Sequence, residues 1–175
     1  MSNQFFLTEE ENDKGQFDWN ADAYLQKQQQ FANDLEDFIG YEFWKTKPRF
    51  AEYDYHIVKP DPNLFIGTAT IVPGTPVYGL AELKYRTISS NSYPDTVVDT
   101  DKIIKMKERA NYTDLPIYIF FRFTDKDMYY KVDLTDNFMQ TINRNTNTTK
   151  DEVWEYKPIS HIPMDKLKKI EEWNG

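Results

Sequence analysis

The sequence predicts a single-domain α/β (α+β) fold in which helices flank a mixed central sheet. Helix-like and strand-like segments follow one another in the order helix, strands, helix, strands. The segment at 116–123 has apolar residues at successive positions, which indicates a strand buried in the middle of a sheet. The chain has 175 residues, of which 39% are hydrophobic, and this is enough to bury a core.

The first helix is predicted from Asp18 to Ile39, and Gly40 ends it. Its apolar residues recur at helical spacing and are Tyr24, Phe31, Leu35 and Phe38. Residues 1–16 are predicted to form a mobile acidic arm before this helix, so that the folded domain comprises residues 17–175.

Four strand-like segments rich in β-branched and aromatic residues follow the first helix. They are Tyr41–Lys47, Glu52–Lys59, Leu64–Val72 and Val77–Thr87. A polar loop at 88–96 then leads into a second helix, which is predicted from Val98 to Ala110.

The C-terminal part is predicted to contain a hairpin, a loop, a strand and a helix. Pro116–Phe123 pairs with Met128–Leu134, and the composition of residues 143–150 is typical of a flexible loop. A strand at Val153–Lys157 and a short helix at Met164–Trp173 complete the chain.

The net charge of −8 is distributed unevenly along the chain. Residues 1–42 hold ten acidic residues and two lysines, whereas residues 43–175 hold nineteen acidic and nineteen basic residues. The acidic excess is therefore confined to the arm and the first helix, where we expect it to be solvated. A neutral remainder can still present a local basic patch.

Residue types that the sequence lacks exclude several classes of protein. The chain has no cysteine, which excludes disulfides, thiol catalysis and Cys-ligated zinc. It has no Gly-rich phosphate-binding loop, and its two histidines, His56 and His161, lie far apart in the sequence. It shows neither a long apolar run nor the pattern of a signal peptide, so a soluble, cytoplasmic protein without a membrane partner is predicted.

The segment VYGLAELKYRT, residues 77–87, has a charged residue at every second position from Glu82 onward. Because successive side chains of a strand point to opposite faces, Glu82, Lys84 and Arg86 share one face. This face is either the solvent side of an ordinary strand or part of a metal site. In the second interpretation Glu82 and the backbone carbonyl of Leu83 supply oxygen ligands for Mg²⁺, and Lys84 supplies an ammonium beside a reacting phosphate.

Such a site needs a second carboxylate from the preceding strand. Asp54 lies in an aromatic and aliphatic strand segment, where an acid is unexpected, and is the favoured candidate. Asp61 is the alternative acid, in a Pro-rich turn where aspartate is common. The triplet Glu155-Tyr156-Lys157 has the same spacing as Glu82-Leu83-Lys84, but it lies between a flexible loop and Pro158 and is interpreted as a surface strand.

The chain resembles the PD-(D/E)xK nuclease superfamily in two strand segments, Tyr53-Asp54-Tyr55 and Ala81-Glu82-Leu83-Lys84-Tyr85-Arg86. The lysine-rich helix and the strand that follow these segments also match the order of elements in that superfamily. This restriction-endonuclease-like group includes Holliday junction resolvases and many phage nucleases. Its αβββαβ core would here be extended by a hairpin strand and a short C-terminal helix. The resemblance covers residues 18–135, roughly, and implies that residues 17–175 form a nuclease-like domain.

The resemblance implies an endonuclease that hydrolyses phosphodiester bonds of DNA and depends on Mg²⁺ or Mn²⁺. Asp54, Glu82 and the Leu83 carbonyl would hold the ion, and Lys84 would position the water or stabilise the phosphate. A short, stand-alone nuclease suits a phage that acts inside an infected host. A homodimer, and either a protein partner or a self-contact for the acidic arm, remain open alternatives.

Two further features bear on this interpretation. Many members of the superfamily have an acid on the first helix that helps to hold metal. This chain has glutamines at Gln28–Gln30, and Glu36 lies nearer the helix end, which puts a second metal in doubt. Lys102, Lys105 and Arg109 recur along one side of the second helix. Together with Arg86 they would contact phosphates, unless they only form the solvent face of an amphipathic helix.

The alternative function is a nuclease-like fold without catalysis that acts as a nucleic-acid or protein binding module, since fold does not determine function. The acidic arm and the missing helix acid favour that alternative. The complete set of Asp54, Glu82 and Lys84 favours an active enzyme.

Overall fold

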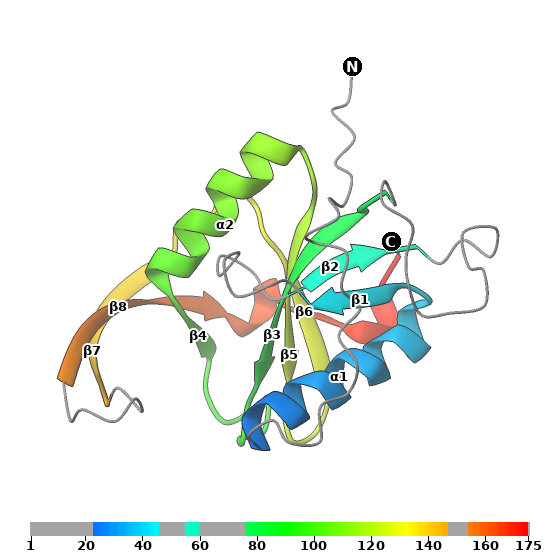
Figure 1. The fold of residues 1–175 in the computed structure, drawn as a ribbon. Coiled ribbons are helices and arrows are strands. Elements are labelled where there is room, and N and C mark those ends of the chain that lie inside the picture. Colours follow the sequence, from blue (N-terminus) through cyan, green and yellow to red (C-terminus); the bar gives the residue numbers. More distant parts are fainter. Residues whose placement is uncertain (1–22, 46–54, 60–75, 147–153, 175) are drawn as a thin grey trace.

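The computed structural model describes residues 23–45, 55–59, 76–146 and 154–174. In these residues the largest unit is a six-stranded sheet with the strand order β1-β2-β3-β5-β6-β9 (Figure 1). Its strands are β1 (Glu42–Lys45), β2 (Tyr55–Val58), β3 (Gly79–Tyr85), β5 (Ile117–Arg122), β6 (Asp127–Lys131) and β9 (Lys168–Lys169).

A second sheet of three strands has the order β4-β8-β7 and extends away from the larger sheet (Figure 1). Its strands are β4 (Asp95–Asp99), β7 (Met139–Thr146) and β8 (Trp154–Pro163). The described helices are α1 (Ala23–Ile39), α2 (Thr100–Thr113) and two 3-10 turns, η1 (Met164–Lys166) and η2 (Ile170–Glu172). None of the described helices is long and apolar enough to cross a membrane.

The two long helices cover opposite faces of the six-stranded sheet, and each encloses its own hydrophobic cluster. On one face Phe31 and Leu35 of α1 pack with strand residues that include Leu83 and Phe120. On the other face α2 contributes to a cluster whose members include Ile103, Met106, Leu80, Ile119 and Phe121. Glu82 lies two residues after Leu80 in β3, so its side chain points to the same face of the sheet, which α2 covers.

β3 and β5 form a parallel pair in the middle of the sheet, with Glu82 opposite Ile119. α2 lies in the chain between these two strands, as a parallel pair requires. At the start of the pair the two backbones approach closely, because a Cβ at Gly79 would lie only 3.0 Å from the carbonyl oxygen of Pro116. The absence of a side chain at Gly79 thus permits the close contact that begins the β3–β5 pairing.

The structure confirms the mixed α/β architecture that the sequence predicts. β5 is buried on both faces, as the apolar run at 116–123 indicates, and it pairs with β6 in the predicted hairpin. β1 and β3 fall within their predicted segments, and the described part of the segment 52–59 forms β2. The segment Leu64–Val72, the arm at 1–16 and the first residues of the predicted helix lie outside the described residues.

The predictions for residues 95–113 were wrong in two respects. Val98 belongs to strand β4, which the sequence analysis assigned partly to a loop and partly to a helix. The helix starts at Thr100 because the Asp99 carboxylate accepts a hydrogen bond from the amide nitrogen of Asp101, 3.0 Å away, and so caps it. It ends at Thr113, where Asp114 adopts a left-handed conformation with φ of 56°.

The C-terminal predictions also need correction. Residues 143–146, predicted as part of a flexible loop, continue strand β7 and pair with β8, because cross-strand pairing outweighs their polar composition. β8 continues past Pro158 to Pro163. The predicted helix at 164–173 is wrong, since the chain there forms η1, the short strand β9 and η2, and β9 pairs with the edge of β6.

Candidate active site

Glu82 occupies the middle of β3 and is 1% exposed. A carboxylate buried between apolar strands is unfavourable unless cations or hydrogen-bond donors surround it. Two ammonium groups meet this requirement, because Nζ of Lys84 lies 2.7 Å and Nζ of Lys102 lies 2.6 Å from Oε1 of Glu82. The structure therefore places one carboxylate and two lysines at a single point on the α2 face of the sheet.

The two lysines reach Glu82 from different elements. Lys84 lies two residues further along β3, on the same face of the strand, as the alternation of the sequence predicts. Lys102 lies in the first turn of α2, which the Asp99 cap fixes directly after β4. The sequence analysis expected Lys102 among the phosphate-contacting residues, whereas in the structure its ammonium pairs with Glu82.

Helix α1 approaches the same part of β3 from the opposite face. Nε2 of Gln28 lies 3.3 Å from the carbonyl oxygen of Leu83, and Oε1 of Gln28 lies 3.4 Å from Nζ of Lys45. Gln28 is buried. Many members of the superfamily have an acid on this helix, whereas here the amide of Gln28 contacts the backbone beside Glu82. Glu36 lies at the helix end, where it accepts a hydrogen bond of 2.7 Å from the amide of Phe43.

Arg86 contacts the second sheet. Its Nη2 donates to the carbonyl oxygen of Val97, and its Nε lies 3.4 Å from Oγ1 of Thr96. Its guanidinium also lies over the ring of Phe121, 5.7 Å from the ring centre. Arg86 thus connects the end of β3 to β4, a role that the alternation of charges did not indicate.

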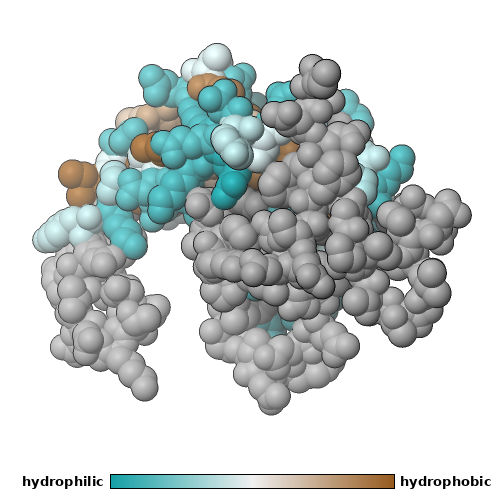
Figure 2. All heavy atoms as spheres, turned by 45° about the horizontal axis from the view of Figure 1, so that its top comes forward, coloured by the Kyte–Doolittle hydropathy of each residue, from teal (hydrophilic) through white to brown (hydrophobic). Residues whose placement is uncertain are grey.

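Lys105 and Arg109 lie on the outer side of α2. Lys105 is exposed, Arg109 is partly buried, and with Glu108 and Tyr112 they line a shallow hollow of about 310 Å³. The surface in this region is mainly hydrophilic, with scattered apolar residues (Figure 2). Among the four residues predicted to contact phosphates, Lys105 and Arg109 are therefore the two that lie on the outer face of α2.

The oxygen donors suit a hard divalent cation, although the described residues supply only part of a coordination shell. They offer the Glu82 carboxylate and the adjacent Leu83 carbonyl, and oxygen ligands of this kind are those that Mg²⁺ prefers. Within the described ranges no three histidine, aspartate or glutamate side chains gather to hold an ion. Both candidates for the second acid, Asp54 and Asp61, lie outside the described residues.

The two histidines lie in separate sheets, His56 in β2 and His161 in β8. His161 contacts Asp95 through Nδ1 at 3.2 Å and Thr141 through Nε2 at 2.7 Å. Tyr156, in the second Glu-x-Lys triplet, is 70% exposed in β8. Neither histidine contributes a side chain to the Glu82 cluster through a contact that the structure records.

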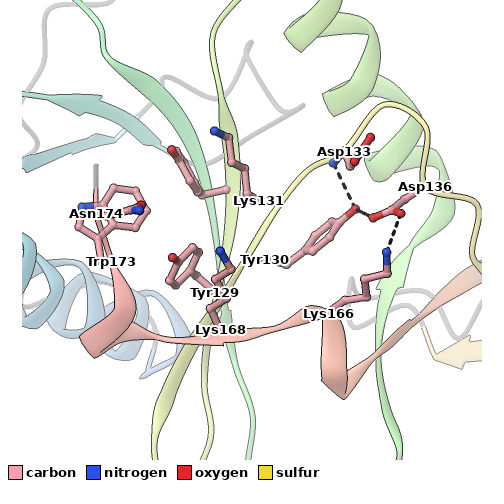
Figure 3. A pocket seen from close by; sticks show the side chains of 10 residues that line it. Tyr129, Tyr130, Lys131, Asp133, Asp136, Lys166, Lys168, Trp173 and Asn174 are labelled. Atoms are coloured by element: carbon pink, nitrogen blue, oxygen red, sulfur yellow. Dashed lines mark hydrogen bonds and ion pairs between the residues drawn. The ribbon is translucent and has the colours of Figure 1, made fainter.

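A pocket of about 420 Å³ lies at the β6 edge of the larger sheet, beyond the end of β9 (Figure 3). In it the hydroxyl of Tyr130 donates to Oδ2 of Asp136 at 2.7 Å, and Nζ of Lys166 lies 3.0 Å from Oδ1 of the same carboxylate. Since none of the predicted site residues lines this pocket, it is separate from the Glu82 cluster.

The contacts of Lys102 and Gln28 join residues far apart in the chain, so no local pattern in the sequence predicts them. The stripe of basic residues on α2 identified Lys102, but only the packing of that helix on β3 decides that its ammonium reaches a carboxylate. The run of three glutamines on α1 was likewise visible, without any indication of which one faces the sheet.

Comparison with known proteins gives a match to the model of a protein family. This family is described as "Phage putative PDDEXK endonuclease", and its model matches residues 17–170. The matched region includes both helices, every described strand and the Glu82 cluster. Neither a search of curated proteins nor a search of solved structures gives a match.

Proposed function

The chain belongs to this family of phage PDDEXK endonucleases, and on that premise we propose that it is a divalent-metal-dependent endonuclease that hydrolyses phosphodiester bonds of DNA. The observation that supports the proposal most directly is the buried Glu82 carboxylate with the Lys84 ammonium 2.7 Å away on the same strand. A charged pair inside a sheet costs stability relative to apolar side chains. Its presence in a member of a nuclease family favours a role in the reaction.

We propose Asp54 as the second metal ligand. Tyr55 pairs with Ala81 in the antiparallel β2–β3 ladder. Asp54 directly precedes Tyr55 in the sequence, and Glu82 directly follows Ala81 in β3. Asp61 is the alternative, and a cleavage assay on both alanine variants separates the two.

In the proposed mechanism Glu82, Asp54 and the Leu83 carbonyl hold Mg²⁺ or Mn²⁺. The ion would lower the pKa of a bound water and offset the negative charge that develops on the phosphate. The Lys84 ammonium, already beside Glu82, would orient the attacking water or stabilise the same charge. Lys105 and Arg109 would bind backbone phosphates, which is the main source of affinity for DNA. We assign Arg86 to holding β4 against β3.

The test is cleavage of supercoiled plasmid and of single-stranded circles by the purified protein with Mg²⁺, with Mn²⁺ and with EDTA. Glu82→Gln and Lys84→Met are the site variants, and Lys168→Met, an exposed lysine in β9, is the charge-matched control. We expect metal-dependent nicking by the wild type and the control, and none by the two site variants.

The same assay tests the alternative function. Two ammonium groups already neutralise Glu82, which would also suit a nuclease-like fold that binds nucleic acid without cutting it. A wild-type protein that is folded and binds DNA, yet cuts neither substrate with either metal, would establish the binding module and exclude the enzyme.

A further inference from the structure

One oxygen atom of Glu82 has an unusual concentration of positive charge around it. The Lys84 and Lys102 ammonium groups both lie within 2.7 Å of Oε1, so the three side chains together have a formal charge of +1. A divalent cation bound to the same carboxylate would meet two ammonium groups at short range and be repelled by both. Both ammonium groups therefore compete with a cation for Oε1 of Glu82.

The two lysines are not equally free to move. Lys84 is fixed two residues from Glu82 on the same strand face, so its ammonium stays near the carboxylate in any rotamer that points along that face. Lys102 reaches the carboxylate from another element. It also lies in the first turn of α2, where the helix dipole disfavours a cation. The ion pair with Glu82 offsets this unfavourable position of the Lys102 ammonium.

We propose that Lys102 competes with the divalent cation for Oε1 of Glu82, and that its ammonium, once displaced, binds a phosphate of the DNA. This inference rests on the proposed function, in which Glu82 holds the metal. Lys102 is then a positioning residue that couples two binding events. Metal binding releases a cation for the substrate, and substrate binding removes a competitor of the metal, so each ligand tightens the binding of the other by the same factor.

The first test is calorimetric titration of the protein with Mn²⁺ in the absence of DNA. Lys102→Met removes the competing charge, and we expect its Mn²⁺ affinity to exceed that of the wild type on the order of tenfold. Lys102→Arg keeps the charge and should bind Mn²⁺ as the wild type does. Lys168→Met, which removes an exposed lysine in β9, should also match the wild type. If Lys102→Met does not fold, Lys102→Gln is a second neutral variant that keeps a hydrogen-bond donor for Oε1.

The second test measures the affinity for a phosphorothioate duplex, which resists cleavage, with and without Mn²⁺. In the wild type and in Lys168→Met we expect Mn²⁺ to raise this affinity, whereas in Lys102→Met the gain should be mostly lost. Equal Mn²⁺ affinities for the wild type and Lys102→Met, or an undiminished gain in the variant, would overturn the inference.

These outcomes separate the inference from the proposed function. If neither the wild type nor Lys102→Met binds Mn²⁺, and Glu82→Gln behaves like both, the proposed metal site is wrong and the inference fails with it. If Mn²⁺ binding depends on Glu82 but not on Lys102, the metal site stands and only the competition is excluded.

Discussion

The amide nitrogen Nε2 of Gln28 lies 3.3 Å from the carbonyl oxygen of Leu83, and this contact connects α1 to β3 at the residue after Glu82. It places a neutral donor, on the helix that covers one face of the sheet, against an oxygen that we propose as a metal ligand. A hydrogen bond to a backbone oxygen fixes the position of that oxygen and occupies one of its lone pairs. Gln28 is therefore the residue of α1 through which the helix can influence the site.

Changing Gln28 to glutamate should make the stability of the protein depend on metal. The new carboxylate would face the Leu83 carbonyl with no proton to donate. Without metal, this repulsion should lower the free energy of unfolding by about 1–3 kcal/mol. The nearby Lys45 ammonium should reduce that loss in part. A bound cation would remove that repulsion. Urea unfolding with and without Mn²⁺ should show a larger stabilisation by Mn²⁺ in Gln28→Glu than in the wild type.

The matched control for Gln28→Glu is Gln30→Glu on the same helix. Gln30 is exposed and its amide donates to Asp34 at 2.9 Å, away from the Leu83 carbonyl. Its variant should respond to Mn²⁺ as the wild type does. If Gln28→Glu gains no more than Gln30→Glu, Gln28 does not adjoin the metal site.

Lys84→Met and Glu82→Gln should differ in metal binding, although both stop cleavage. Loss of the Lys84 ammonium removes stabilisation of charge in the transition state, and we expect the cleavage rate to fall by about two to four orders of magnitude. Mn²⁺ affinity should not weaken, because a positive charge has been removed from beside Glu82. Glu82→Gln should lose both properties. Single-turnover cleavage and Mn²⁺ titration measure them, and a Lys84→Met protein that binds Mn²⁺ more weakly would contradict the assignment.

Lys105→Ala should weaken DNA binding to the same extent for every sequence tested. If Lys105 neutralises a phosphate, the slope of log affinity against log salt should decrease by about one. Fluorescence anisotropy with two unrelated duplexes at several salt concentrations provides the measurement. An unchanged slope would place Lys105 on the solvent side of α2, outside the DNA interface.

Asp136→Asn should remove part of the stability of the protein at neutral pH, but not in acid. The hydrogen bond from Tyr130 is the main reason why the pKa of Asp136 lies below its usual value. Burial raises this pKa, and the contact with Lys166 lowers it further. A carboxyl whose pKa is lower in the folded state stabilises the fold at pH above its unfolded value of 3.8, and this contribution disappears as the pH falls through the folded value.

The free energies of unfolding of wild type and Asp136→Asn should therefore differ at pH 7 and converge below about pH 4. Chemical denaturation at a series of pH values tests this expectation. Asp165→Asn, which changes an exposed carboxylate in η1, serves as the control. A difference that persists unchanged at pH 3 would mean that Asp136 acts through packing rather than through its charge.

The sequence was most informative where burial decides the structure. The apolar run at 116–123 identified β5, and the alternation from Glu82 to Lys84 predicted their common face, because a central strand must bury one or both faces. β4 and β7 were missed, since these strands consist mainly of polar residues and depend on pairing with β8. Pairing between distant segments leaves no local pattern in a polar strand.

The contacts of the candidate site also differ in how far the sequence predicts them. Glu82 and Lys84 belong to one strand, so local spacing alone brings them together. The contacts of Lys102 with Glu82 and of Gln28 with Leu83 depend on how each helix is rotated on the sheet, which the apolar stripe of a helix fixes only coarsely. The sequence at 164–173 predicts a helix, because the apolar residues of the two 3-10 turns recur at a spacing close to that of a helix.

The parallel pairing of β3 with β5 affects the protein during its own synthesis. Glu82 gains its neighbour Ile119 only after the ribosome has translated α2 and then β5, so a nascent chain that ends before Ile117 has no central sheet around the carboxylate. Fragments from interrupted translation would therefore lack an assembled active centre.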